Sequence, residues 1–300
     1  MYNKFYPWII SLRLKTIPLS LSAILVGNAL AYWQHQFSFW ILLFSLITAS
    51  LLQILSNLAN DYGDEIKGSD QNNLTAHNRG IQLGLITLKQ LKIALWINIF
   101  LCILFGLILL IFACNNIYEL FIFILLGLLS IVAAITYTIG KKPYGYIGFG
   151  DLSVLTFFGL IGVMGSFYLQ TKVFSLSIIL PSLGCGLLSV AVLNINNLRD
   201  IELDRKSNKR TLVVMIGKCM GRYYHLLLLL IAFCSLSLFA YNKLQTIWSG
   251  LFILTLPLFI KHIYMVFQFN THKEGVPLLL QMVKLALLTN LLYCLGIILS

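Results

Sequence analysis

Carboxylate and amide side chains with the spacing of a metal site stand out first in this sequence. The first group is Asn57, Asn60, Asp61 and Asp64. On a helix these positions are three or four residues apart, so their side chains form one polar stripe. Mg²⁺ prefers carboxylate oxygens and takes its remaining ligands from water and from substrate phosphates. The stripe therefore indicates a Mg²⁺ site that binds a diphosphate.

A second stripe of the same chemistry lies about two thirds along the chain, at Asn196, Asn197, Asp200 and Asp204. Asp200 and Asp204 are one helical turn apart and share a face with one of the two asparagines. Acidic residues of an ordinary basic loop would show no such register. We interpret the four aspartates of the two stripes as metal ligands.

The sequence allows two interpretations of the asparagines of the first stripe. Asn57 and Asn60 either complete the metal's coordination sphere or hydrogen-bond to neighbouring helices.

Basic residues follow both stripes and offer hydrogen-bond donors to phosphate oxygens. Lys67 and Arg79 follow the first stripe, where Asp70 is a further possible ligand. Lys209 and Arg210 follow the second. All four cations are candidates for substrate binding.

A third polar segment, residues 140–151, contains Tyr146 between glycines and ends in Asp151. Its glycines allow the backbone to approach a ligand closely, but glycines also simply end helices. Asp151 either caps a helix or contacts substrate. We include Tyr146 and Asp151 among the candidate substrate-binding residues.

The elements that must position these groups are membrane spans. Of 300 residues, 59% are hydrophobic and only 10% are charged, which is typical of an integral membrane protein. A spanning helix needs about 17 to 25 apolar residues. The nine stretches that qualify are 17–34, 38–58, 91–113, 117–139, 152–170, 174–195, 223–241, 247–268 and 280–299. We expect an all-α membrane protein with nine transmembrane helices in a single domain, residues 1–300.

The net charge of +11 follows from membrane topology. With nine spans, 19 of the 21 lysines and arginines lie in or beside segments on one side, and only Lys172 and Lys243 lie opposite. Basic residues gather in cytoplasmic loops. We therefore expect a cytoplasmic N-terminus and cytoplasmic loops at 59–90, 140–151 and 196–222, which carry both stripes. The charge gives no reason to expect a nucleic-acid partner.

Other common sites are disfavoured. No Gly-x-Ser-x-Gly, Walker A or His-Glu-x-x-His pattern is present, which argues against a serine hydrolase, a P-loop ATPase and a zinc protease. The six cysteines lack Cys-x-x-Cys spacing and are interpreted as small buried apolar residues. The five histidines form no helical pair, and we interpret His225 as a residue at the end of a span.

The two aspartate motifs on cytoplasmic loops of a nine-span chain resemble those of the UbiA superfamily of intramembrane prenyltransferases. The surrounding sequence is similar to the branch that prenylates 1,4-dihydroxy-2-naphthoate. The segments that carry this resemblance are NLANDYGDEIKGSD (57–70), RGIQLGLIT (79–87), YTIGKKPYGYIGFGDLSVLTFFG (137–159) and NNLRDIELDRKSNKRTL (196–212). The resemblance implies a bundle of nine helices around a cavity that opens to the membrane and is capped by the cytoplasmic loops.

It also implies roles for particular residues. The four aspartates would bind Mg²⁺ and the diphosphate of a long polyprenyl donor, with the four asparagines beside them. Four basic residues would bind the diphosphate or the carboxylate of the acceptor: Lys67, Arg79, Lys209 and Arg210. The implied reaction releases CO₂ and diphosphate and gives demethylmenaquinol, at the cytoplasmic face of a bacterial inner membrane.

Three departures from the family pattern concern loop prolines. The family's Arg-Pro-Lys-Thr reads Arg13-Leu14-Lys15-Thr16, its Gly-Pro before Arg79 reads His77-Asn78, and its Gly-Pro-x-Pro reads Gly140-Lys141-Lys142-Pro143. These changes affect loop rigidity rather than a ligand, so they bear on substrate preference more than on chemistry.

Two rival functions remain. A sister prenyltransferase acting on 4-hydroxybenzoate, a tetrapyrrole or haem would keep the aspartate motifs but not their sequence contexts. A cation-coupled transporter would also carry intramembrane acids. It would place them near mid-span in broken helices, whereas these stripes lie at the ends of spans on one side.

Overall fold

The protein is helical throughout the residues that the structure describes. This computed structural model describes residues 6–67 and 80–300, and within them there are helices and turns but no strand. Eight described helices are long and apolar enough to cross a bilayer, and the bent pair α1 and α2 makes a ninth if it counts as one span. The prediction of an all-α membrane protein is confirmed, and the predicted nine spans match the larger count.

The α-helices are α1 (Tyr6–Leu12), α2 (Ile17–Trp33), α3 (Phe39–Lys67), α4 (Leu88–Ala113), α5 (Ile117–Thr136), α6 (Gly150–Val154), α7 (Ser166–Thr171), α8 (Ile179–Lys206), α9 (Leu212–Phe239), α10 (Leu256–Gln268) and α11 (His272–Ile298). Four 3₁₀-helices and two π-helices lie between them. The 3₁₀-helices are η1 (Leu14–Thr16), η3 (Tyr144–Tyr146), η5 (Leu176–Ile178) and η7 (Ile247–Thr255), and the π-helices are η4 (Leu155–Gly165) and η6 (Ala240–Leu244).

The chain divides into two compact units. Unit 1 comprises Met1–Pro18, Leu43–Gly150 and Glu202–Thr211. Unit 2 comprises Leu19–Leu42, Asp151–Ile201 and Leu212–Ser300. The last turn of α8 therefore belongs to unit 1 together with α4, α5 and α3 from Leu43 onward.

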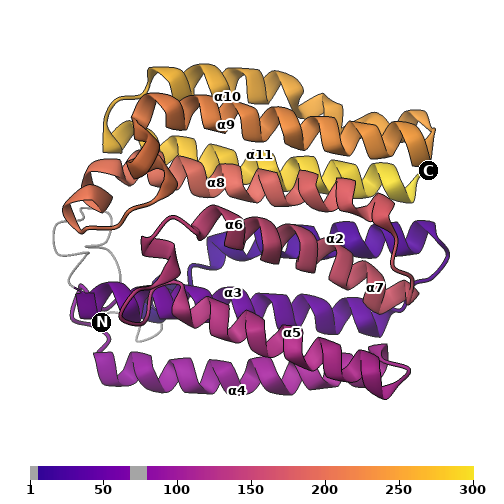
Figure 1. Ribbon diagram of the computed structural model, residues 1–300, viewed down its shortest axis with the longest axis horizontal. Coiled ribbons are helices and arrows are strands. Elements are labelled where there is room, and N and C mark those ends of the chain that lie inside the picture. The colour runs from indigo at the N-terminus through magenta and orange to yellow at the C-terminus, as the bar shows by residue number, and fades with distance from the viewer. Residues whose placement is uncertain (1–5, 68–79) are drawn as a thin grey trace. The chain divides into compact units, whose positions relative to one another are not determined.

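The core of unit 1 forms where α3, α4 and α5 run alongside one another (Figure 1). Leu55 and Leu58 of α3 join Leu91 and Leu95 of α4 in one buried apolar cluster, against which Ala134 of α5 packs. This packing continues along α3 past the predicted end of its span near residue 58, and the helix runs on to Lys67. The first polar stripe is therefore helical, as its spacing predicts.

Unit 2 has its own core between α2, α8, α9, α10 and α11. Its members include Val26, Leu188, Leu229, Phe259 and Met282, one from each of these helices. As in unit 1, a helix extends beyond its predicted span, because α8 continues to Lys206 and includes the second polar stripe.

Two sequence-based interpretations in unit 2 were wrong. Cys219 and Cys234 are exposed rather than buried. His225 is not at the end of its helix, because α9 runs from Leu212 to Phe239 and its one break, at Gly217, lies eight residues before His225. Its side chain is fully buried. The imidazole lies against that of His262 on α10, with 5.3 Å between the ring centroids.

Close helix packing in unit 2 depends on paired glycines. A Cβ atom at Gly159 of η4 would lie 2.6 Å from the carbonyl oxygen of Ser182 and 3.0 Å from Cα of Gly186 on α8. Both are backbone atoms, so a side chain can be accommodated only if η4 and α8 separate.

We expect Gly159→Ala to lower the free energy of unfolding by about 1–3 kcal/mol, the usual cost of overpacking. The measurement is the midpoint of thermal unfolding in detergent. Gly106→Ala on α4 is the matched control, because nothing lies within 4 Å of its Cβ position, and alanine favours a helix by about 1 kcal/mol over glycine. Equal midpoints for the two variants would contradict this account of the packing.

Candidate functional site

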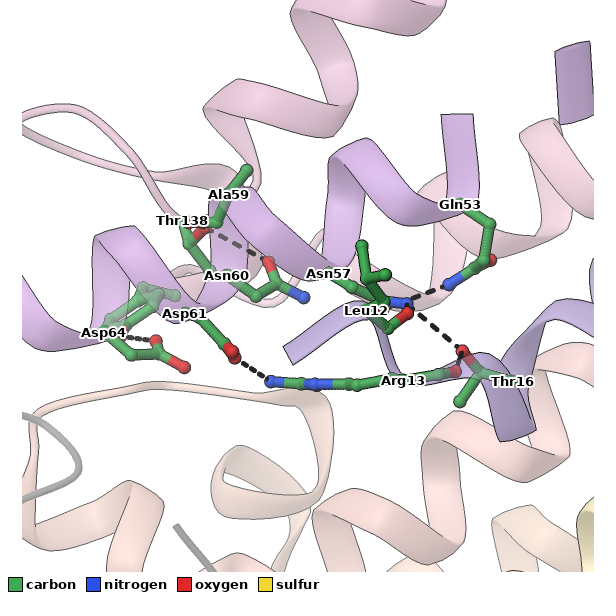
Figure 2. A network of polar contacts seen from close by, with 11 residues as sticks. Leu12, Arg13, Thr16, Gln53, Asn57, Ala59, Asn60, Asp61, Asp64 and Thr138 are labelled. Carbon is green, nitrogen blue, oxygen red and sulfur yellow. Dashed lines mark hydrogen bonds and ion pairs between the residues drawn. The ribbon is translucent and has the colours of Figure 1, made fainter. Parts of the chain in front are cut away.

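The first polar stripe occupies the last turns of α3 in unit 1. Asp61 has no exposed surface, and its Oδ1 accepts a hydrogen bond of 2.6 Å from Nη2 of Arg13 in an ion pair (Figure 2). Burial of a carboxylate is costly unless a cation compensates its charge. Arg13 supplies that compensation from the turn between α1 and α2.

The stripe's asparagines bond to neighbouring elements of unit 1 (Figure 2). The amide of Asn57 donates to the carbonyl oxygen of Leu12 at 2.9 Å and to Oγ1 of Thr16 at 3.3 Å. The amide oxygen of Asn60 accepts from Oγ1 of Thr138, which lies 3.1 Å away. The sequence allowed Asn57 and Asn60 either to ligate a metal or to hydrogen-bond to neighbouring segments. This geometry favours the hydrogen bonds.

Asp64 from the first motif and Asp204 from the second are connected in unit 1 through Tyr146 and Lys209. With Tyr146, Lys67 and Lys209 they form what we call the Asp64–Asp204 cluster. The Tyr146 hydroxyl donates to Oδ1 of Asp64 at 2.7 Å, and Nζ of Lys209 lies 3.5 Å from Oδ1 of Asp204. Both lysines also contact the Tyr146 ring, with Nζ of Lys67 4.1 Å and Nζ of Lys209 5.5 Å from its centroid.

The charge of Lys209 is set by this cluster. Burial is the largest influence on its pKa and lowers it, but Asp204, Tyr137, Asp64 and Tyr146 together outweigh burial and raise the pKa above its ordinary value. Lys209 is therefore a cation at neutral pH. It interacts electrostatically with one carboxylate from each motif. An anionic ligand bound there would be attracted by the positive charge of Lys209.

Two backbone features position the cluster. After α8 the chain turns at Asn208, whose φ of 56° is left-handed, a conformation that asparagine tolerates. The turn allows the Arg210 amide to donate to the Tyr146 carbonyl oxygen at 2.9 Å. Gly145 precedes the tyrosine, and a Cβ there would lie 2.7 Å from the carbonyl oxygen of Tyr137. Glycine is thus required for this close approach.

Asp200 lies in unit 2 with a separate set of partners. Arg199 donates to both of its carboxylate oxygens, through Nε at 2.7 Å and through Nη2. Nε2 of His272 at the start of α11 lies 3.1 Å from Oδ1 of Asp200. Arg199 also donates to the amide oxygen of Asn196 at 2.9 Å, and Asn197 is buried.

The other candidates are placed as follows. Asp151 begins unit 2 in the first turn of α6 and accepts a hydrogen bond from Tyr224 of α9. Arg210 is exposed. Arg79 and Asp70 lie outside the described residues.

The donor set suits Mg²⁺ bound together with a phosphorylated ligand. Among the described residues no three His, Cys, Asp or Glu side chains converge into a ready metal cage. Mg²⁺ does not need one, because it usually binds through one or two carboxylates and takes waters and substrate phosphates as its other ligands. Asp61, Asp64 and Asp204 offer hard oxygen donors in unit 1, next to cations that can contact phosphate.

Two residues that make these contacts were not assigned to the site from the sequence. Arg13 was noted only within the Arg13-Leu14-Lys15-Thr16 segment, and His272 was not singled out at all. The signal for Arg13 is physical: a buried acid at the end of a span requires a cation, and Arg13 precedes the neighbouring span.

Comparison with known proteins identifies the family. The model of the UbiA prenyltransferase family matches residues 20–288. The chain is 52% identical over 293 residues to a 1,4-dihydroxy-2-naphthoate octaprenyltransferase of Escherichia coli (strain K12), covering 98% of this chain and 95% of the relative.

Solved structures share the fold. The apo structure of a UbiA homolog from Aeropyrum pernix K1 superposes with a TM-score of 0.68 at 17% identity, covering 96% of this chain and 98% of the other. A UbiA homolog from Archaeoglobus fulgidus bound to DMAPP and Mg²⁺ superposes with a TM-score of 0.54 at 13% identity, covering 95% and 98% of the two chains. From its sequence match and its fold, the chain belongs to the UbiA prenyltransferase family.

Proposed function

We propose that this protein transfers an isoprenyl group from a polyprenyl diphosphate to 1,4-dihydroxy-2-naphthoate, with release of diphosphate and CO₂. The observation that carries the proposal is the Asp64–Asp204 cluster, in which one aspartate from each motif flanks the cation Lys209. The choice of acceptor is supported by the 52% identical relative, which is a 1,4-dihydroxy-2-naphthoate octaprenyltransferase.

In this proposal the donor's diphosphate binds at the two aspartate motifs. Asp61, Asp64 and Asp204 would hold Mg²⁺ in unit 1, and Asp200 lies one helical turn before Asp204 on α8. The metal would neutralise the diphosphate and stabilise the charge that develops on it as the allylic C–O bond breaks. Lys209 and Lys67 would donate hydrogen bonds to the oxygens of the diphosphate.

The chemistry of the acceptor follows from its carboxylate. The electron-rich ring carbon that carries the carboxylate attacks the allylic carbon, and the electrons of the breaking C–O bond leave with diphosphate. The bond to the carboxylate then breaks, CO₂ departs, and the electron pair of that bond restores aromaticity. The product is demethylmenaquinol, the prenylated quinol intermediate of menaquinone biosynthesis. We assign the acceptor carboxylate to Arg79, because a guanidinium binds it bidentately.

The test uses carboxyl-labelled 1,4-dihydroxy-2-naphthoate, a polyprenyl diphosphate and Mg²⁺ with the purified protein. We expect about one labelled CO₂ for each prenyl group transferred, and none without the diphosphate. A 4-hydroxybenzoate prenyltransferase would retain the carboxylate of its own acceptor. Prenylated product that retains the label would refute the decarboxylative reaction, and absence of any prenylated product would refute the acceptor.

We also propose a location and an orientation. Residues 1–300 would form one catalytic domain of the bacterial inner membrane, in agreement with a single family match across residues 20–288. The N-terminus and the helix ends that carry the aspartate motifs, with the segments that follow them, would be cytoplasmic. The support is that 14 of the 21 lysines and arginines lie in or beside those segments, and that 19 of the 21 lie on that side of the nine predicted spans.

A further inference from the structure

The backbone at Arg13 is unusual for a residue that bears a side chain. Its φ of 49° and ψ of 50° are left-handed, a conformation that costs a non-glycine residue roughly 1–2 kcal/mol. The turn is closed by the Thr16 amide, which donates to the Arg13 carbonyl oxygen at 2.8 Å. Such strain persists only where the surroundings enforce it, and it concentrates at functional sites.

Asn57 enforces this turn. Its amide donates to the residue just before Arg13, at the Leu12 carbonyl oxygen, and to the Thr16 hydroxyl just after it. Asn57 and Asp61 are one turn apart on α3, so the residue that holds the turn and the residue that receives the guanidinium share one helix face. Figure 2 shows the result, in which Arg13 extends along α3 and ends at Asp61.

A divalent metal would compete with Arg13 for Asp61. The guanidinium nitrogen lies 2.6 Å from Oδ1, and a Mg²⁺ ligated by this carboxylate would sit about 2.1 Å from its oxygen. The two cations would then be close neighbours at a buried carboxylate, where like charges repel strongly. A carboxylate without either cation would carry an uncompensated buried charge.

We propose that Arg13 is an exchangeable counter-ion: it neutralises Asp61 in the metal-free protein and is displaced when a divalent metal binds, so that it sets the metal affinity of the first stripe. The inference rests on the metal site in the proposed function. In unit 2 Arg199 stands in the same relation to Asp200, donating to both of its oxygens. Each aspartate motif thus has an arginine that compensates it before the metal arrives.

The test is Arg13→Asn, because asparagine tolerates the left-handed backbone and removes the cation. The readout is Mn²⁺ binding to the full-length protein in detergent, followed by electron paramagnetic resonance, together with thermal unfolding without metal. We expect the variant to bind Mn²⁺ about tenfold more tightly, within the usual range of coupling between sites. We also expect it to unfold several degrees lower than the wild type without metal, and to regain most of that difference with Mn²⁺.

Arg205→Asn is the matched control. Arg205 also pairs with an acid in unit 1, Glu202 at 3.5 Å, but both side chains are more than half exposed. Exposed pairs contribute little, so this variant should match the wild type in both measurements. Unchanged or weaker Mn²⁺ binding in Arg13→Asn would overturn the inference, because a merely structural arginine would support the ligand geometry rather than compete for it.

A second measurement needs no variant. If metal displaces Arg13, the amides of residues 6–17 in the wild type should exchange hydrogen faster once Mn²⁺ is added, and unchanged or slower exchange would overturn the inference. If the wild type binds no Mn²⁺, the metal site of the proposed function fails as well. If the wild type binds Mn²⁺ and Arg13→Asn binds it equally, only the role of Arg13 fails.

Discussion

Asp64→Asn and Asp204→Asn are each expected to lower kcat/KM by about 10²–10³-fold, the usual effect of removing one group that stabilises transition-state charge. Both carboxylates belong to the cluster around Lys209 and Tyr146. Asparagine nearly keeps the volume of aspartate but lacks the negative charge that attracts a metal. Both proteins should therefore remain folded in the membrane, and prenyl transfer at saturating Mg²⁺ is the measurement.

Glu202→Gln is the control for these variants. Glu202 lies on the same last turn of α8 as Asp204, but its side chain is 71% exposed and pairs only at 3.5 Å with Arg205. This change should leave turnover within about twofold of the wild type, as expected for a surface pair. Normal Mg²⁺-dependent turnover in both aspartate variants would exclude the cluster as the diphosphate site.

Lys209→Met is expected to weaken binding of the polyprenyl diphosphate and not binding of the acceptor. Lys209 is held cationic by Asp204 and Asp64, and a hydrogen bond to a charged group contributes about 1.5–3 kcal/mol. Its loss should raise KM for the polyprenyl diphosphate by roughly tenfold or more. KM for 1,4-dihydroxy-2-naphthoate should stay unchanged, since that acceptor carries no diphosphate. The measurement is steady-state kinetics with each substrate varied in turn.

Lys206→Met provides the comparison, because Lys206 is the last residue of α8, three positions before Lys209, and is exposed. It should leave both KM values as they are in the wild type. An equal rise in the two KM values of Lys209→Met would indicate a general loss of structure instead of a donor contact.

The helical parts of the site were predictable because a helix fixes which residues are neighbours. The spacing of Asn57, Asn60, Asp61 and Asp64 is informative only if the chain is helical there, and α3 does run through all four positions. The predicted span ends before helix α3 does, because hydropathy declines where polar residues begin. The helix itself continues as long as its other face packs, as it does at Leu58 and Ala59.

Contacts between distant segments could not be predicted in this way. The Tyr146 hydroxyl reaches Asp64 across 82 residues of sequence, and Arg13 reaches Asp61 across 48. The second contact also needs a left-handed arginine, which no residue preference favours. Sequence spacing identifies acids that share a helix face, but the cations that neutralise them come from turns whose geometry is set by tertiary contacts.

The start of α11 bears on how inherited variants of this protein would be interpreted. A Cβ at Gly275 would fall 2.7 Å from Cγ and 2.9 Å from Cβ of Arg199, the arginine that holds Asp200. A missense change there alters no acid and no cation of either motif. The added side chain would nevertheless displace Arg199 and so disturb its hydrogen bonds to the Asp200 carboxylate. In a genetic screen such an allele would have the phenotype of an active-site lesion while mapping to an unremarkable position in the last helix.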